Sequence, residues 1–261
     1  MNCKTMSAYN RPLISIIIAV FNGEKTLNCT IESLISQSYK HIQLIIVDGA
    51  STDRTVDIIR NNMSSIDHFI SEPDSGIYDA WNKGLKKARG EWVAFLGAGD
   101  IYLSSALENY VKFICDNNFY DVDLISSQVE LIENGLPIKV IGKRWDWSIF
   151  RRYMNIAHVG ALHNINLFKK YGNFNSTYKI CGDYEFLLRA NNELNAKFIK
   201  LTTAQMLSGG VSSGLHSLWE ACKAKATSGR LNGLICLFDL SVAFIKYNIK
   251  ILHFRLCKKY G

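Results

Sequence analysis

Continuous apolar runs alternate with amphipathic stretches along the first hundred residues. The runs are rich in β-branched residues and have the pattern of parallel strands covered on both faces. The stretches between them place apolar side chains at helical spacing. The expected strands are residues 13–20, 42–47, 67–70 and 92–96, and the expected helices include residues 24–37 and 78–89. This alternation predicts an α/β fold with a doubly wound, mostly parallel sheet and right-handed crossovers.

The middle of the chain predicts additions to this sheet. Residues 124–133 and 137–142 are separated by Asn134-Gly135, which predicts an added hairpin with its second strand at an edge. Residues 143–156 mix aromatic and arginine side chains without a clear period. Further elements are expected as helices near residues 104–115, 164–171 and 182–194 and a strand at FIKL (198–201).

The last part of the chain predicts an amphipathic helical tail. From Leu231 to Leu256, apolar residues recur at helical spacing. An opposing polar line consists of Asn232, Asp239, Lys246 and His253. Charge interrupts the segment too often to predict a transmembrane span, so the helix either lies on a membrane or packs on protein. We therefore expect a catalytic domain at residues 1–213 and a tail at residues 214–261.

Most of the net charge lies in this tail. The chain carries +7, and from Trp219 onward eight lysine and arginine residues face only two acidic ones. Basic residues beside an apolar face favour anionic lipid, which predicts peripheral attachment to the cytoplasmic face of an inner membrane. A nucleic-acid-binding protein would more often spread its basic residues over the domain, so no nucleic-acid partner is expected.

Cysteine usage and the first residues indicate a reducing compartment. The seven cysteines are scattered and never in C-x-x-C spacing, which predicts free thiols instead of disulfides or a zinc site. The first twelve residues contain no apolar stretch, so no secretory signal is expected. Both features predict a cytoplasmic protein.

Polar or acidic residues follow four of the expected strands. They are Phe21-Asn22, Asp48, Glu72 with Asp74, and Asp100. Ligands bind outside the carboxyl ends of parallel strands. Any one aspartate is also explained as a cap of the next helix, but the recurrence predicts a ligand site at this edge.

The loop after the first strand excludes two kinds of nucleotide site. AVFNGEKTL contains only Gly23, so it lacks both the dinucleotide glycine motif and the P-loop lysine motif. Asp48 offers a carboxylate to the N–H of a uracil base. Phe21 either stacks on that base or packs in the core.

Asp100 is a candidate metal ligand at the end of an apolar strand. Mg²⁺ or Mn²⁺ often takes one or two protein carboxylates and completes its shell with phosphate oxygens and water. One aspartate therefore suffices when the ligand brings a diphosphate, whose departing charge the metal would neutralise. The alternative is a cap for the helix expected near Ser104.

Asp183 is a candidate general base within CGDYEFLLR, residues 181–189. Asp183 and Glu185 are two residues apart, so they do not share a helix face and only one reaches a site. A carboxylate at a helix start suits removal of a proton from a hydroxyl. The alternative is a partner for the helix dipole.

The order of these motifs resembles the bacterial family 2 glycosyltransferases with the GT-A fold, of the O-antigen, capsule and exopolysaccharide type. The resemblance covers residues 12 to about 213 and rests on SIIIAVFN, VDGASTD, SEPDSGIYDAWNKG, RGEWVAFLGAGD, His158, GDYEFLLR and GGVS. It implies transfer of a sugar, with inversion, from a nucleotide-diphosphate sugar. By position it implies that Asp48 binds uracil, Asp100 binds Mg²⁺ or Mn²⁺, and Asp183 is the catalytic base.

The resemblance also assigns donor-binding positions. Glu72, Asp79 and Asn82 fall in the segment that lies against the donor in similar enzymes. His158 matches a histidine near the diphosphate, although a lone histidine is otherwise explained as a core residue. Gly209-Gly210-Val211-Ser212 either wraps the diphosphate through backbone N–H groups or forms a turn.

Two positions depart from the family pattern. The usual V-D-D-G-S is here VDGAS at residues 47–51. The usual pair of aspartates before the metal is Gly99-Asp100, so the donor contact expected at Gly99 must come from backbone, water or another residue. The departure leaves the strength of metal binding open.

Together these features predict an inverting, metal-dependent glycosyltransferase. The expected donor is a nucleotide sugar, with UDP favoured, and the expected acceptor is a lipid-diphosphate-linked saccharide in surface polysaccharide synthesis. One alternative is a non-catalytic nucleotide-sugar-binding or scaffold protein, because of Gly99. A sugar nucleotidyltransferase would need a loop rich in glycine and lysine after the first strand, which AVFNGEKTL does not supply.

Overall fold

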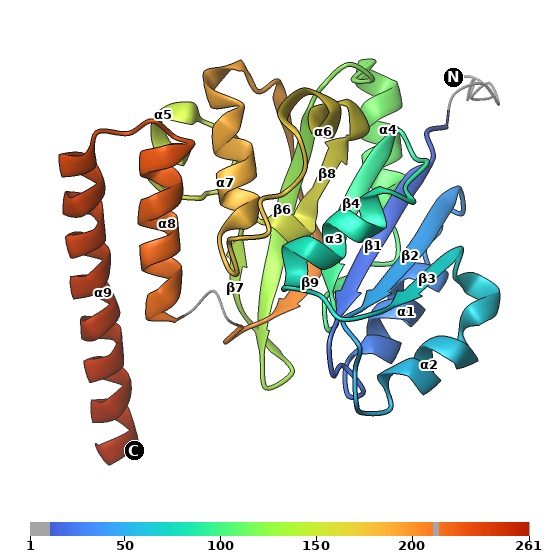
Figure 1. Cartoon of the computed structure of the whole chain (residues 1–261), viewed down its shortest axis with the longest axis horizontal. Helices are drawn as coiled ribbons and strands as arrows, with labels where there is room; N and C mark the ends of the chain where they lie inside the picture. Colours follow the sequence, from blue (N-terminus) through green and yellow to red (C-terminus); the bar gives the residue numbers. More distant parts are fainter. Residues whose placement is uncertain (1–10, 211–213, 261) are drawn as a thin grey trace, which may run out of the picture.

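The computed structural model describes residues 11–210 and 214–260, with side chains described up to residue 249. It is an α/β fold built on one nine-stranded sheet (Figure 1), which confirms the predicted class. The strands are β1 (Ile14–Val20), β2 (Ile42–Asp48), β3 (His68–Ser71), β4 (Trp92–Gly97), β5 (Ile101–Tyr102), β6 (Leu124–Glu133), β7 (Leu136–Ile141), β8 (Ala161–Asn164) and β9 (Ala196–Leu207). The helices are α1 (Leu27–Ile35), α2 (Thr55–Asn61), α3 (Ile77–Leu85), α4 (Ala106–Asn117), α5 (Trp147–Phe150), α6 (Ile165–Tyr171), α7 (Gly182–Arg189), α8 (Leu215–Thr227) and α9 (Gly233–Tyr260).

The sheet is parallel in its first part and mixed beyond it. Its strand order is β3-β2-β1-β4-β8-β6-β9-β5, with β7 paired to β6. The strands β1 to β4 run parallel, as the alternation of strands and helices predicted. β8 is antiparallel to β4 and β6, whereas β9 is parallel to β6. The predicted hairpin is present as β6 and β7, with Asn134 and Gly135 at positive φ in its turn.

Each face of the sheet carries its own apolar core, which makes the sheet doubly wound. Successive residues of β1 point to opposite faces, so Ile16 and Ile18 pack with α1 and α4. Ile17 and Ala19 pack with α3, α6 and α7 on the other face. The two helices that carry most of the candidate site, α3 and α7, are thus anchored on one face of the sheet.

Several elements differ from those expected. β9 has twelve residues instead of four, because its pairing with β6 and β5 continues through residues that form no apolar run. α7 ends at Arg189, and a 3₁₀ turn at Asn191–Glu193 replaces its predicted last residues. The unpatterned residues 143–156 contain α5, which begins where Asp146 accepts the N–H of Ser148 at 2.9 Å. The four-residue strand β8 is too short to produce a recognisable hydrophobic pattern.

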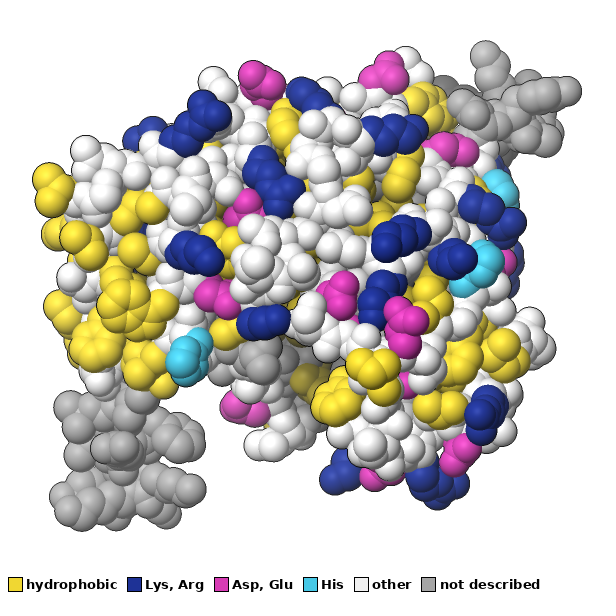
Figure 2. Space-filling model, viewed as in Figure 1, with side chains coloured by type: hydrophobic (Ala, Val, Ile, Leu, Met, Phe, Trp, Pro, Cys, Tyr) yellow, Lys and Arg dark blue, Asp and Glu magenta, His cyan; other side chains and the backbone are white. Residues whose placement is uncertain are grey.

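The C-terminal part contains two helices where one was predicted. α8 packs on α7, and α9 runs back along α8 (Figure 1). Asp239, on the polar line of α9, is buried in ion pairs with Arg152 and Lys225. The polar line at Asp239 therefore faces the protein and leaves apolar side chains outside, as Figure 2 shows on the tail side. The exposed apolar residues of α9 are Leu234, Ile235, Leu237, Phe238, Phe244, Ile245 and Ile249.

Within residues 11–210 and 214–260, none of the helices combines the length and apolar character needed to cross a membrane.

Candidate active site

The ends of β1, β2 and β3 lie side by side at one edge of the sheet. Strand pairing places Val20 opposite Asp48 and Asp48 opposite Ser71. Phe21, the next residue after Val20, is 63% exposed, which excludes the core-packing alternative for its ring. Stacking of Phe21 on a nucleotide base stays a prediction.

The carboxylate of Asp48 is buried among hydrogen-bond donors. Ser71 Oγ donates to Asp48 Oδ2 at 2.6 Å, and the N–H of Ser51 lies 3.2 Å from both carboxylate oxygens. These bonds fix the carboxylate at the end of β2. Its contact with a uracil base stays a prediction.

The loops after β1 and β2 are joined to each other. The N–H of Asn22 donates to Ser51 Oγ at 2.7 Å, and Asn22 Oδ1 accepts the N–H of Thr52 at 2.9 Å. The N–H of Gly23 donates to Thr55 Oγ1 at 2.8 Å. These backbone donors are used within the protein, in agreement with the lack of a glycine-rich phosphate motif.

The segment expected against the donor is held by its own contacts. Lys83 pairs with Glu72 at 3.0 Å, and Asp79 accepts a backbone N–H at 3.0 Å. Asn82 donates to the carbonyl of Phe174 at 2.8 Å and accepts its N–H at 3.0 Å. Both polar groups of Asn82 therefore clamp the loop that contains Phe174. Donor binding by Glu72, Asp79 and Asn82 stays a prediction.

Asp100 closes a turn after β4. Its Oδ2 accepts the N–H of Gly97 at 2.7 Å. The following helix, α4, begins only at Ala106, with Ser105 at its cap position, so the helix-cap alternative is excluded. Burial raises the pKa of the Asp100 carboxyl to about 6, and the hydrogen bond from Gly97 offsets this only in part.

Gly99 has a conformation that explains its departure from the family pattern. Its φ is +108°, a backbone conformation that residues other than glycine rarely adopt, and a Cβ there would lie 3.1 Å from Leu207 Cδ1. Its N–H donates to Thr30 Oγ1 at 2.8 Å. The turn thus favours glycine where similar enzymes carry an aspartate, and a donor contact at Gly99 would use its carbonyl oxygen.

His158 lies in an aromatic cluster beside the same site. Its ring stacks on Trp81 with the centroids 5.0 Å apart and on Phe95 at 5.6 Å. Burial lowers the pKa of His158 to about 3, so the imidazole is neutral. Neither ring nitrogen has a hydrogen-bond partner in the described part of the chain, so His158 is no satisfied core residue. Its approach to a diphosphate stays a prediction.

The surroundings of Asp100 fit a divalent cation that a nucleotide diphosphate brings with it. Asp100 and the unpartnered ring of His158 line one pocket, and Asp100 Oδ1 makes no hydrogen bond within the described residues. Among those residues, no three His, Cys, Asp or Glu side chains gather into a metal-binding group. One carboxylate, that of Asp100, would leave the other coordination positions to phosphate oxygens and water.

Asp183 stands in the first turn of α7. Its Oδ1 lies 3.0 Å from Tyr78 Oη and accepts the N–H of Tyr184 at 2.9 Å. Oδ2 makes no hydrogen bond within the described residues, and burial raises the pKa of the carboxyl. Glu185 points away and pairs with Arg189, which confirms that only one of the two carboxylates reaches the site.

Glu220 is a residue of the site that the sequence did not indicate. From α8 its carboxylate accepts the backbone N–H groups of Lys179 at 2.8 Å, Ile180 at 2.8 Å and Cys181 at 2.9 Å. It thereby holds the loop that leads into Asp183. After burial and local hydrogen bonds, the charge of Glu220 also contributes to the raised pKa of Asp183. A lone acid on a helix with no predicted role gives no sequence signal.

We expect Glu220→Gln to lower kcat by about tenfold. The amide replaces one acceptor oxygen by a donor, so the loop that leads into Asp183 (the base loop) loses a hydrogen bond of about 1–3 kcal/mol. Loss of the charge should also lower the pKa of Asp183. The acid limb of the pH–rate profile should therefore move to lower pH, which a purely structural role would not produce. Glu193→Gln, at an exposed acid that pairs with Lys170, is the control and should leave both quantities unchanged. An unmoved acid limb in Glu220→Gln would contradict the assignment.

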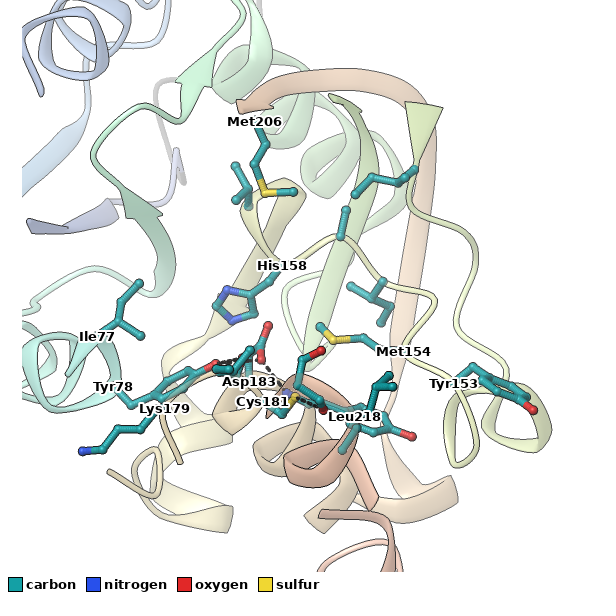
Figure 3. Close-up of a pocket in the computed structure, with 18 of the residues that line it drawn as sticks. Ile77, Tyr78, Tyr153, Met154, His158, Lys179, Cys181, Asp183, Met206 and Leu218 are labelled. Carbon is teal, nitrogen blue, oxygen red and sulfur yellow. Dashed lines mark hydrogen bonds between the residues drawn. The ribbon is translucent and has the colours of Figure 1, made fainter. Parts of the chain in front are cut away.

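A pocket of about 520 Å³ joins the two candidate carboxylates. Asp100, Trp81 and His158 line it together with Asp183. In Figure 3, Tyr78 and Lys179 lie on one side of Asp183, and Leu218 and Tyr153 on the other. The pocket thus brings the predicted metal ligand and the predicted base to one space.

The glycine segment after β9 is only partly described. Gly209 has φ +85°, and a Cβ there would meet nothing within 4 Å. Val211 and Ser212 lie outside the described residues, so the predicted wrapping of a diphosphate by residues 209–212 stays a prediction.

Glycosyltransferases are found among the known sequences that are similar to this chain. A family model, Glycosyl transferase family 2, matches residues 15–184. The PGL/p-HBAD biosynthesis glycosyltransferase of Mycobacterium tuberculosis is 29% identical over 215 residues, which are 77% of this chain and 80% of that protein. The UDP-Glc:alpha-D-GlcNAc-diphosphoundecaprenol beta-1,3-glucosyltransferase WfaP of Escherichia coli is 40% identical over 103 residues, 39% of this chain and 41% of that protein.

Solved structures share the fold. S. aureus TarS in complex with UDP-GlcNAc superposes with a TM-score of 0.67 at 17% identity, covering 91% of this chain and 72% of that one. The mannosyltransferase PcManGT from Pyrobaculum calidifontis, in complex with GDP-Man and Mn²⁺, gives 0.64 at 16% identity and covers 92% and 76%. The predicted GT-A fold is confirmed by these neighbours.

Proposed function

The chain belongs to glycosyl transferase family 2, and we propose that it transfers a sugar, with inversion, from a UDP-sugar to a hydroxyl of a lipid-diphosphate-linked saccharide. The observation that carries the proposal is the pocket shared by Asp183 and Asp100. It offers a desolvated base for an acceptor and a carboxylate for a metal-bound diphosphate. The name of one relative, a diphosphoundecaprenol-dependent glucosyltransferase, supports a lipid-linked acceptor.

In the proposed reaction Asp183 is the general base. Its Oδ1 is held by Tyr78 and the backbone of Tyr184, which leaves Oδ2 to take the acceptor's hydroxyl proton. The freed oxygen forms a bond to the anomeric carbon as the bond to the nucleotide diphosphate breaks, and the diphosphate departs with the electron pair. Attack opposite to the leaving group inverts the configuration.

Asp100 holds the donor side of the reaction. Asp100 would hold Mg²⁺ or Mn²⁺, which when bound neutralises charge on the departing diphosphate, and His158 in the same pocket would lie near that diphosphate. Asp48 and Phe21 would hold the uracil ring of the donor nucleotide. Glu72, Asp79, Asn82 and the carbonyl of Gly99 would lie against the rest of the donor.

The tail supports a place on the cytoplasmic face of an inner membrane. Its exposed apolar side chains on α9 lie beside Lys246, which is also exposed. Apolar area with basic residues favours an anionic lipid surface, where a lipid-linked acceptor of O-antigen, capsule or exopolysaccharide synthesis would be met. The basic side chains beyond residue 249 lie outside those described.

A donor panel tests the proposed function. Purified protein with Mn²⁺ is mixed with UDP- and GDP-sugars and a synthetic lipid-diphosphate-sugar acceptor. We expect a mass increase of one sugar with a UDP-sugar, and loss of that product with EDTA. The same mixture without acceptor controls for donor hydrolysis. Tight binding of UDP without turnover of any donor would instead favour the non-catalytic nucleotide-sugar-binding or scaffold protein that Gly99 suggested.

A further inference from the structure

The pocket that contains Asp183 continues away from the donor side toward the tail helices. At that end its wall is formed by Leu218 and Ala221 of α8 and by Leu240 and Ala243 of α9. The pocket is therefore bounded by the tail as well as by the sheet, and the space next to the base opens onto a predominantly apolar wall.

A second cavity of about 350 Å³ lies between α8 and α9 and shares Leu218 and Leu240 with the first. We call it the tail groove. It is lined by Leu215, Leu218, Trp219, Leu240, Ser241, Phe244 and Ile245. Among these, Trp219 is 64% exposed, so the groove opens at the surface of the protein. The two cavities are thus neighbours with a shared apolar wall of Leu218 and Leu240.

Positive charge lies in the wall of the first cavity, the catalytic pocket. Arg152 and Lys225 both line the catalytic pocket and both pair with Asp239. Two cations share this one carboxylate, and the side chain of Lys225 is only 6% exposed. Tyr153 also contacts this group, with its Oη 3.3 Å from Asp239 Oδ1. A buried surplus cation in a pocket wall is stabilised by an anionic ligand.

We infer that the acceptor binds as an amphiphile, with a phosphate at Arg152 and Lys225 and its hydrocarbon chain in the tail groove. The inference rests on the proposed lipid-linked acceptor and assigns its place. The features of the protein match the parts of such a molecule: Asp183 would meet the sugar hydroxyl, Arg152 and Lys225 the phosphate, and the neighbouring tail groove the hydrocarbon chain. Hydrocarbon in the groove would cover apolar surface that the described chain leaves in contact with water.

Direct binding tests this assignment without turnover. The full chain is titrated with decyl phosphate, methyl phosphate and decanol, followed by calorimetry. We expect decyl phosphate to bind at least about tenfold more tightly than methyl phosphate or decanol. Burial of each methylene contributes about 0.8 kcal/mol, and the phosphate adds pairing with the cations.

Matched variants separate the groove from the cations. Ser241→Trp fills the groove and should weaken decyl phosphate binding about tenfold or more, whereas Ala226→Trp, at an exposed residue of α8 outside the groove, should not. Arg152→Gln should weaken decyl phosphate binding but leave decanol binding unchanged. Circular dichroism and Tm establish that each variant is folded.

Three results that need no donor would overturn the assignment. They are equal affinity for decyl and methyl phosphate, wild-type binding in Ser241→Trp, and a concentration-dependent dimer that Ser241→Trp abolishes, which would make the groove a contact between copies. Because no donor is present, these results are independent of the donor panel. Sugar transfer that ignores acceptor chain length would sink the inference and leave the proposed function standing.

Discussion

Asp183→Asn is expected to lower kcat by about 10²–10⁴-fold, the range for loss of a general base. Asparagine keeps the size of the side chain and an oxygen that can accept from Tyr78 Oη and the N–H of Tyr184. It cannot take a proton from an acceptor hydroxyl. The affinity for UDP, measured by calorimetry with Mn²⁺, should therefore stay within about twofold of the wild type, because the substitution leaves the proposed contacts to the nucleotide in place.

The pH–rate profile gives the same assignment a second measurement. Burial raises the pKa of Asp183, and only its deprotonated form acts as a base. The rate of the wild-type enzyme should therefore fall as the pH drops through that raised value, at a higher pH than an ordinary aspartate would give. Asp183→Asn should show a low rate without this base-dependent limb.

Glu185→Gln is the matched control, two residues along the same helix. Glu185 is buried in an ion pair with Arg189 and accepts the hydroxyl of Ser228, so the change should lower Tm. Turnover per folded molecule should remain near that of the wild type. Full turnover in Asp183→Asn, or an equal loss in both variants, would contradict Asp183 as the base.

The fold could be predicted where the sequence pattern and the burial coincide. The parallel strands β1, β2 and β4 are buried on both faces and therefore appear as continuous apolar runs. β8 and the second half of β9 have no such run, because their place depends on partners distant in the chain. Local patterns carry no information about those partners.

The site could be predicted where a residue acts through its own position in a motif. Asp100 and Asp183 follow glycines at the start or end of an element, and both line the pocket. Glu220 and Asp239 act through tertiary contacts, one on the base loop and the other on Arg152 and Lys225. Neither spacing nor composition indicates such contacts, so the role of α8 in the site could not be inferred from the sequence.

Asp100→Asn is expected to lower the kcat of metal-dependent transfer by about 10²–10³-fold, while it stabilises the protein without ligands. The pKa of Asp100 is raised from 3.8 to about 6, so the folded chain holds this proton more tightly than the unfolded chain. Stability without ligands therefore falls as the pH rises from about 4 to about 6, and the charged form costs about 1–3 kcal/mol at pH 7. Asparagine removes that cost, so Tm at pH 7 should rise by several degrees.

With Mn²⁺ and UDP present, the Tm of the wild type should exceed that of Asp100→Asn. The ligands bind the folded wild type and raise its Tm, because binding to the native state alone adds to stability. Asp100→Asn lacks the charge that a cation needs, so its Tm should respond much less. Asp57→Asn, at an exposed residue of α2, is the control for a lost negative charge and should change neither Tm nor its response. If Asp100→Asn keeps the Mn²⁺-dependent shift, the cation is held elsewhere. If the Tm of Asp100→Asn without ligands falls, other groups of the fold stabilise the charged carboxylate of Asp100. Its burial then does not destabilise the wild-type protein.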